Sequence, residues 1–167
     1  MVTLNNTLTV EDVWGLLNQI IDPDIPVINI VELGLVRNVK IGTNNCIVVT
    51  LTPSYSGCPA MHVFKEEITT LLKENGANAV EIVTTLLPAW STDWLSAETK
   101  AKLKHYGIAP PQGLASDNKF LFSTKKIICP RCESNNTKLI SQFGSTACKA
   151  LYKCDACEET FDYFKCH

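Results

Sequence analysis

The sequence predicts an α+β protein of two domains: a small mixed three-stranded sheet with helices, in the order α-β-β-α-β-α, and a C-terminal zinc-ribbon-like domain. Three observations predict this architecture. Apolar residues in the first part of the chain recur with helical and strand periods in that order. The composition then shifts at a stretch rich in Pro, Gly and small polar residues. Beyond it, cysteines occur as two Cys-x-x-Cys pairs, a spacing typical of zinc sites.

Length and composition indicate a globular protein. A chain of 167 residues can form one domain with a core plus a small appendage. No run of about 18 apolar residues occurs, and no basic segment followed by an apolar one begins the chain, so we expect no membrane span, no signal peptide and a cytoplasmic location. A net charge of -2 gives no reason to expect nucleic acid as a partner. Eight cysteines in a reducing compartment indicate metal binding or reactive thiols rather than disulfides.

The first predicted helix begins at Thr9, where Asp12 completes a capping box with a shorter acid than usual. Its expected apolar face consists of Val13, Trp14, Leu17, Ile20 and Ile21. The two prolines of the segment 22–26 end the helix. Asp22 and Asp24 beside these prolines are candidates for metal binding or acid-base chemistry. The alternative is a structural role, because Asx-type turns explain acids next to proline equally well.

The following segments predict the sheet. Residues 29–36 form one helical turn closed by Gly34, and strands at 36–41 and 46–51 are joined by turn residues at 42–45. The alternation at 79–87 predicts a third strand. This strand is expected to run parallel to the second one, since a crossover helix joins them, whereas the hairpin strands are antiparallel.

The loop at 52–60 reads Thr-Pro-Ser-Tyr-Ser-Gly-Cys-Pro-Ala and places one thiol, that of Cys58, between a strand and the helix predicted at 61–72. Unpaired N-H groups and the helix dipole at this point favour a thiolate, the nucleophilic and metal-binding form of cysteine. Pro59 suits the first helical position. The alternative is that Cys58 is a small buried residue beside a tight turn. His62 is expected to be exposed or to cap the helix, with complementing the thiol as the alternative.

Trp90 and Trp94 precede a helix predicted at 96–106, which Gly107 ends. We expect the two indoles to pack this helix on the sheet, and the alternative is a partner-binding patch. His105 is expected on the surface. Residues 109–118 have the composition of a linker, which predicts domains at 1–115 and 116–167.

Four cysteines form the expected metal site of the second domain, with 21 residues between the two pairs: Cys129, Cys132, Cys154 and Cys157. Two such knuckles complete the sulfur tetrahedron that structural Zn²⁺ prefers, and an iron centre is the alternative. A domain this small buries little core, so a bound metal would stabilise it. Cys148, Cys166 and His167 are candidate additional ligands of a second, more labile site; the alternatives are a packing residue and a mobile chain end.

Three motifs resemble a known domain: D-P-D-I-P, N-I-V-E-L-G-L-V and T-P-S-Y-S-G-C-P-A. Over about residues 14–87 they are similar to the domain shared by cytosolic iron-sulfur assembly factors and bacterial metal-sulfur maturation proteins. With L-P-A-W-S-T-D-W, C-P-R-C, F-G-S-T-A-C-K-A-L-Y-K-C-D-A-C and F-D-Y-F-K-C-H, the whole chain resembles the PaaD (PaaJ) family, small subunits associated with the multicomponent phenylacetyl-CoA epoxidase.

This resemblance implies an iron-sulfur-assembly-like first domain and a role in aerobic phenylacetate degradation, with the oxygenase and reductase subunits of the epoxidase as partners. It matches Cys58 to the single loop cysteine of the family, and Asp22 and Asp24 to its acidic motif. Two functions stay open: a maturation factor that transiently holds iron or an iron-sulfur cluster, and a structural or electron-transfer subunit that is docked in the complex. We expect no catalytic residue, because the sequence has no Gly-rich phosphate loop, paired helical carboxylates or Ser-His-Asp order.

Overall fold

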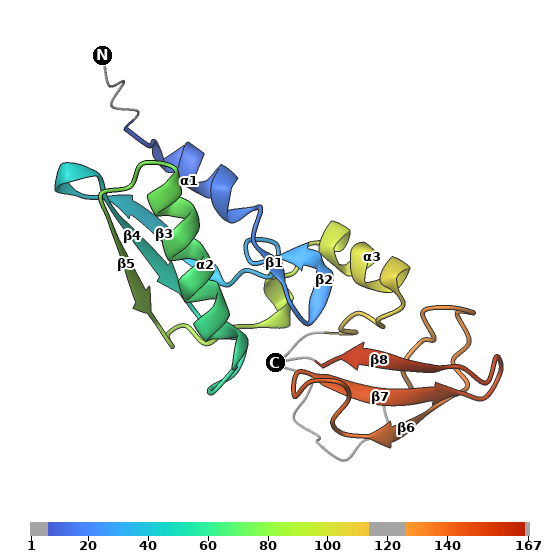
Figure 1. The fold of residues 1–167 in the computed structure, drawn as a ribbon. Coiled ribbons are helices and arrows are strands. Elements are labelled where there is room, and N and C mark those ends of the chain that lie inside the picture. The colour runs from blue at the N-terminus through green and yellow to red at the C-terminus, as the bar shows by residue number, and fades with distance from the viewer. Residues whose placement is uncertain (1–6, 114–125, 166–167) are drawn as a thin grey trace. The chain divides into compact units, whose positions relative to one another are not determined.

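The computed structural model describes residues 7–113 and 126–165. The chain divides into two compact units, residues 1–90 and 91–167, and each contains a three-stranded sheet (Figure 1). The segment before the ribbon belongs to the second unit: the N-H of Ala109 donates to the Asp162 carbonyl at 2.8 Å, and the Ala109 carbonyl accepts from the Phe164 N-H at 2.9 Å. The predicted boundary between residues 115 and 116 lies outside the described residues, so the domain limits 1–115 and 116–167 stay a prediction.

Helix α1 (Val10–Leu17) begins as the sequence predicts. The Thr9 hydroxyl accepts from the Asp12 N-H at 3.1 Å, and the Asp12 carboxylate accepts from the Thr9 N-H at 2.9 Å, which is the reciprocal capping box. The predicted extension of its apolar face through Ile21 is wrong. The Asn18 side chain donates to the Trp14 carbonyl and caps the helix, and Ile21 lies in strand β1 (Ile21–Asp22) with its side chain 43% exposed.

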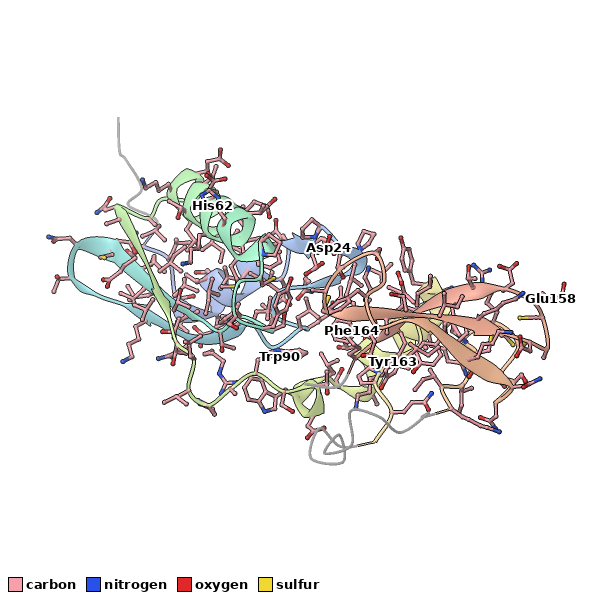
Figure 2. All side chains as sticks on the ribbon, turned by 90° about the horizontal axis from the view of Figure 1, so that it is seen from below. Asp24, His62, Trp90, Glu158, Tyr163 and Phe164 are labelled. Atoms are coloured by element: carbon pink, nitrogen blue, oxygen red, sulfur yellow. The ribbon has the colours of Figure 1, made fainter. Side chains whose placement is uncertain are left out.

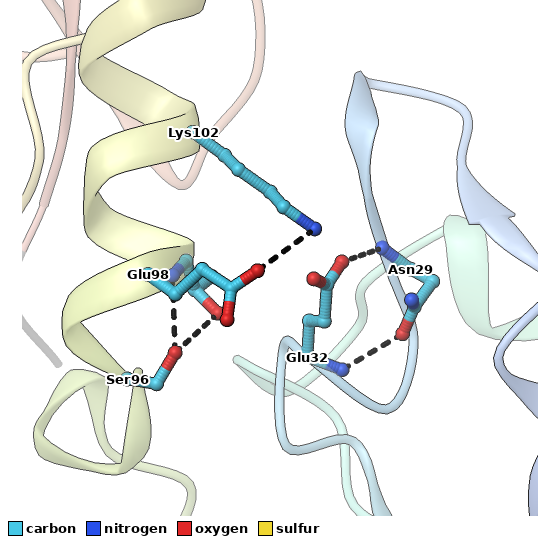
Figure 3. Close-up of polar contacts among 6 residues, drawn as sticks. Asn29, Glu32, Ser96, Glu98 and Lys102 are labelled. Atoms are coloured by element: carbon cyan, nitrogen blue, oxygen red, sulfur yellow. Dashed lines mark hydrogen bonds and ion pairs between the residues drawn. The ribbon is translucent and has the colours of Figure 1, made fainter.

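Strand β2 (Ile25–Asn29) pairs antiparallel with β1 and was not predicted. The prediction that the prolines of 22–26 end the helix is wrong, because α1 already ends at Leu17. Pro26 instead lies in β2, and proline is compatible with such a short edge pairing. The chain then turns at Asn29. Its side chain accepts from the Glu32 N-H, and the Glu32 carboxylate accepts from the Asn29 N-H (Figure 3). The Asn29 side chain also accepts from the Val31 N-H. Gly34, with φ of 69°, closes the predicted turn.

The predicted mixed sheet is confirmed, with strand order β3-β4-β5. Strands β3 (Val36–Ile41) and β4 (Cys46–Leu51) pair antiparallel around the short 3₁₀ turn η1 (Thr43–Asn45). Helix α2 (Ala60–Glu74) crosses over to β5 (Ala79–Thr84), which runs parallel to β4. The predicted third strand was therefore correct in position and direction, although it ends three residues earlier than the range 79–87.

The core of the first unit lies between its helices and one face of this sheet. Helix α1 contacts β3, helix α2 contacts β5, and the two helices contact each other (Figure 1). Fully buried side chains alternate along β4 and recur at helical spacing on α2: Ile47, Val49, Leu51, Phe64, Ile68 and Leu72. Burying one such side chain stabilises the fold by about 1.5–3 kcal/mol, so the sheet and α2 rigidly frame the loop that joins them.

The second unit begins with the 3₁₀ turn η2 (Thr92–Trp94) and helix α3 (Ala97–Tyr106). Ser96 caps α3 by accepting from the Thr99 N-H at 3.0 Å (Figure 3), and Gly107 ends it in the left-handed region at φ of 99°, as predicted. The ribbon consists of three antiparallel strands: β6 (Thr137–Ser141), β7 (Lys149–Cys154) and β8 (Thr160–Phe164).

Trp90 lies in the first unit and is buried. Its indole N-H donates to the Leu33 carbonyl at 2.8 Å, so this ring is a packing residue rather than part of an exposed partner patch (Figure 2). Trp94 is half-buried in η2 of the second unit, and His105 is exposed as expected. Among the helices at 7–113 and 126–165, none is long and apolar enough to cross a membrane.

Candidate metal centre and the Cys58 loop

Each Cys-x-x-Cys pair of the second unit sits on a tight turn with the same backbone construction. In the first, the Cys129 N-H donates to the Ser134 carbonyl at 3.0 Å. In the second, the Cys154 N-H donates to the Glu159 carbonyl at 2.9 Å. The residue after each pair, Glu133 or Glu158, has φ of 61°, and Glu158 marks this end of the ribbon in Figure 2. These two left-handed residues turn the thiols of each pair inward, which the spacing alone did not reveal.

The four sulfur atoms lie together, all within 4.8 Å of one another. The Sγ atoms of Cys129 and Cys157 are 3.8 Å apart, and those of Cys132 and Cys154 are 3.5 Å apart. A regular tetrahedron with metal-sulfur distances of about 2.3 Å has edges of about 3.8 Å, so the thiols fit a single tetrahedral ion. Four protein ligands fill this coordination sphere, which is the property of a structural rather than a catalytic site.

The thiols also differ in their electrostatics. Backbone N-H groups, first that of Cys157 and then that of Ala156, outweigh desolvation and lower the pKa of Cys154 to about 7. At Cys132 the Ser134 N-H lowers the pKa, but desolvation and the neighbouring thiols outweigh it and raise the pKa to about 12. Without a metal, Cys154 therefore forms a thiolate readily whereas Cys132 retains its proton, which an arriving cation must displace.

Cys148 does not belong to this cluster. Its side chain is buried, and its sulfur lies 3.0 Å from the Thr146 hydroxyl, as expected for a packing residue. Cys166 and His167 lie outside the described residues. The second, labile site that these three residues were predicted to form therefore stays a prediction.

Cys58 lies in the loop between β4 and α2, directly before the helix. Its N-H donates to the Tyr55 carbonyl at 3.3 Å, and its own carbonyl accepts from the Met61 N-H at 3.3 Å. Gly57 has φ of 86°, and a Cβ there would touch nothing within 4 Å, so backbone conformation rather than space requires glycine. This tight turn holds the Cys58 thiol at the start of α2. The side chain is half-buried, so its exposure is intermediate between that of a reactive thiolate and that of the buried packing residue, the two alternatives from the sequence.

The N-terminus of α2 offers the positive end of a helix dipole without a compensating acid. No side chain caps the helix, and its first turn contains no acidic residue. A thiolate on Cys58 would therefore meet favourable backbone dipoles. At the start of the same loop, the Thr52 side chain is buried, and its hydroxyl has no hydrogen-bond partner within the part of the chain that the structure describes. Sequence reasoning missed this feature because burial cannot be predicted from a single Thr.

Asp22 has a structural role in its own turn. One of its carboxylate oxygens accepts from the N-H groups of Asp24 and Ile25 at 2.8 and 2.9 Å, and the side chain is buried. This is the Asx-type turn that the sequence left as an alternative. Asp24 is exposed and lies near the tip of the same turn (Figure 2).

The structure does not bring Cys58, Asp22 and Asp24 together as a set of three ligands. Within the described ranges 7–113 and 126–165, the four ribbon cysteines are the only group of three or more His, Cys, Asp or Glu side chains close enough to share an ion. His62 is 80% exposed and lies 3.5 Å from Glu66 on the outer side of α2 (Figure 2), which agrees with the expectation of an exposed histidine.

Two family models match the chain. The model of the iron-sulfur cluster assembly protein matches residues 10–84, and that of the PaaD zinc beta ribbon domain matches residues 115–165. The chain is 48% identical over 158 residues to a putative 1,2-phenylacetyl-CoA epoxidase subunit of Escherichia coli, covering 94% of this chain and 93% of that protein. It is 34% identical over 96 residues to an Fe-S protein maturation auxiliary factor of Porphyromonas gingivalis, covering 57% of this chain and 90% of that one.

Solved structures resemble the first unit. A domain of unknown function from Bacillus anthracis matches with a TM-score of 0.52 at 30% identity, covering 56% of this chain and 89% of that one. A conserved hypothetical protein from Thermotoga maritima matches with a TM-score of 0.51 at 30% identity, covering 58% of this chain and 95% of that one.

The fold and the cysteine cluster thus define a protein that joins an iron-sulfur assembly domain to a zinc beta ribbon. The chain belongs to the PaaD family of phenylacetyl-CoA epoxidase subunits.

Proposed function

We propose that this chain is an accessory subunit of a phenylacetyl-CoA epoxidase and acts as a maturation factor for the iron or iron-sulfur centres of the oxygenase and reductase subunits. The observation that carries the proposal is the half-buried Cys58 at the uncapped start of α2, inside a domain of the iron-sulfur assembly family. A thiol that delivers metal must be reachable, and Cys58 is half-buried at the positive end of the α2 dipole, where a thiolate would meet favourable backbone dipoles.

In this proposal the iron or cluster is cargo, held for a short time by Cys58. A single protein thiolate is a weak and therefore reversible anchor, because stable iron and zinc sites use three or four ligands. The absence of a preformed three-ligand set at Cys58 among the described residues fits a transfer step that the recipient subunit completes with its own ligands. Asp24, exposed on a turn of the same unit, is proposed as part of this transfer surface, and Asp22 as the residue that shapes its turn.

The ribbon has a different role. We propose that Cys129, Cys132, Cys154 and Cys157 hold one structural zinc ion, which cross-links the two knuckles and stabilises a unit with a small core. The sulfur tetrahedron is also the specific observation that favours the second candidate function, an electron-transfer subunit, because iron bound by the same four thiols would be redox-active. Metal analysis of anaerobically prepared protein separates the two: one zinc without a visible charge-transfer band supports the structural role.

The maturation function is tested with epoxidase prepared from cells that lack this chain. The expected result is an assembled but iron-poor complex that regains iron and activity when iron and this protein are supplied together. Iron alone should restore little. A complex that contains full iron without this chain, or that fails to assemble until the chain is present in equal amount, would contradict maturation and support the structural subunit.

A further inference from the structure

A groove of about 600 Å³ lies on the first unit between the segment that joins α1 to β1 and the outer face of α2. Its floor is apolar: Ile20 is buried beneath it, Ile21 is 43% exposed, and Leu71 of α2 is half-buried. Exposing a large β-branched side chain such as Ile21 costs hydrophobic free energy. The groove therefore offers apolar surface that an incoming side chain could cover.

The rim of the groove is acidic. Glu66, Glu67 and Glu74 of α2 line it and are exposed, and none of its lining residues is Lys, Arg or His. Glu66 lies 3.5 Å from the exposed His62, but neither Glu67 nor Glu74 has an ion-pair partner among the described residues. Charges of one sign in a concave surface create a field that attracts the opposite sign.

Glu67 and Glu74 form no ion pair that would stabilise α2 among the described residues. Glu74 is in the last turn of α2, where the negative end of the helix dipole disfavours an anion. Glu67 and Glu74 are seven positions apart and so lie on one face, two turns from each other, with Leu71 between them. Along about 10 Å of helix, the apolar side chain of Leu71 is thus flanked by the carboxylates of Glu67 and Glu74.

We propose that this groove docks a basic, amphipathic peptide segment of a partner protein, with Leu- or Ile-type side chains over Ile21 and Leu71 and Lys or Arg side chains against Glu67 and Glu74. Apolar contact supplies the affinity and the carboxylates supply the orientation and the rate of encounter, as in helix-in-groove recognition. This surface goes beyond the maturation function, because it involves neither Cys58 nor the ribbon cysteines and needs no metal.

The test uses the full chain and a synthetic amphipathic peptide of about four helical turns composed of Lys and Leu, with an otherwise identical Glu and Leu peptide as the control. Titration is followed by the backbone amide NMR signals of the protein. We expect saturable shifts confined to the groove, with Ile21, Thr70 and Leu71 among the largest, for the Lys peptide only. Raising the salt concentration should weaken this binding, because exposed charges are screened.

Two variants and a matched control make the result specific. Glu67→Lys/Glu74→Lys should weaken binding by roughly tenfold or more, since it reverses two exposed charges. Ile21→Ser should weaken it through lost apolar contact, and Glu81→Lys/Glu98→Lys, with the same change in net charge at exposed sites elsewhere, should leave it unchanged. Equal thermal unfolding midpoints establish that all variants fold.

Three results would overturn the proposal. Shifts spread evenly over the surface, or binding that the control variant weakens as much as the groove variant, would indicate only general attraction of charge. Equal binding of the Glu peptide would remove the electrostatic argument. A dimer in solution that Ile21→Ser dissociates would show that a second copy of this chain, and not a basic partner segment, occupies the groove.

Discussion

At the scale of single residues, the family resemblance groups Asp22 and Cys58 as site residues, but the structure places them in different environments. Asp22 is buried and accepts two backbone N-H groups within its own turn, whereas Cys58 is half-buried at the end of a loop, before a helix without a side-chain cap. A residue that shapes a turn affects stability when it is removed. A residue that exchanges ligands affects transfer and leaves the fold intact.

This difference predicts the outcome at Asp22. Asp22→Ala leaves the Asp24 and Ile25 N-H groups without their acceptor, so the free energy of unfolding of the first unit should fall by about 1–3 kcal/mol. The exposed Asp24→Ala is the matched control and should cost less. Chemical denaturation followed by tryptophan fluorescence measures both. Equal stability of Asp22→Ala and the native chain would contradict the structural role of this carboxylate.

At the scale of elements, capping residues and periodicity were sufficient to predict the first helix start, the β3-β4 hairpin, the crossover helix, the parallel third strand and α3. The pairing of β1 with β2 was missed, because two short segments around a proline turn have too little alternation to mark a strand. The four cluster cysteines follow from their spacing. The spacing of residues in the sequence could not predict that Trp90 and Thr52 are buried, because burial depends on distant parts of the chain.

We expect the ribbon strands and their knuckles to depend on a metal ion bound by the four cysteines. Cys132→Ser removes one of four thiolates from a unit whose buried core is small, so we expect loss of zinc and protease cleavage within the ribbon, while the first unit keeps its unfolding transition. Cys148→Ser is the matched control: it makes the same exchange at a cysteine outside the cluster and should retain zinc. A Cys132→Ser protein with full zinc and a resistant ribbon would contradict the assignment.

The thiols of the four ribbon cysteines also predict how zinc binding depends on pH. Zinc holds thiolates, so it lowers the pKa of each bound sulfur relative to the free thiol; the stabilisation is complete above the free-thiol pKa and is lost as the pH falls. Because the free Cys132 thiol has its pKa raised to about 12 and Cys154 has its pKa lowered to about 7, zinc must displace protons at neutral pH. Affinity should therefore rise roughly tenfold per pH unit for each proton released.

Competition with a chelator at about pH 6 and about pH 8, combined with calorimetry in buffers of different ionisation enthalpy, measures both the affinity and the protons released. A zinc affinity that is independent of pH over this range would mean that the free thiols are already ionised, contrary to the electrostatics of the cluster.

At the scale of the whole molecule, the two units carry different chemistry. The second unit presents four thiols in a closed tetrahedron that suits a permanent ion, and the first presents the half-buried Cys58 thiol at a helix start, which suits a transient one. This division lets each variant be checked in both units. The unfolding transition of the first unit reports whether a Cys58 variant is folded, and retained ribbon zinc reports that its second unit is undisturbed. For a ribbon variant, an unchanged transition of the first unit reports that the damage is local.

The central claim is that Cys58 passes iron to the epoxidase, and it is tested most directly by the iron content of the oxygenase and reductase subunits recovered from a deletion strain that expresses Cys58→Ser. Cys46→Ser is the matched control, because Cys46 is also a half-buried cysteine of the first unit. We predict that the Cys58→Ser chain retains ribbon zinc and associates with the epoxidase subunits, yet leaves them deficient in iron, while Cys46→Ser restores it. Normal iron and epoxidase activity with Cys58→Ser would contradict the claim and leave Cys58 as a packing residue.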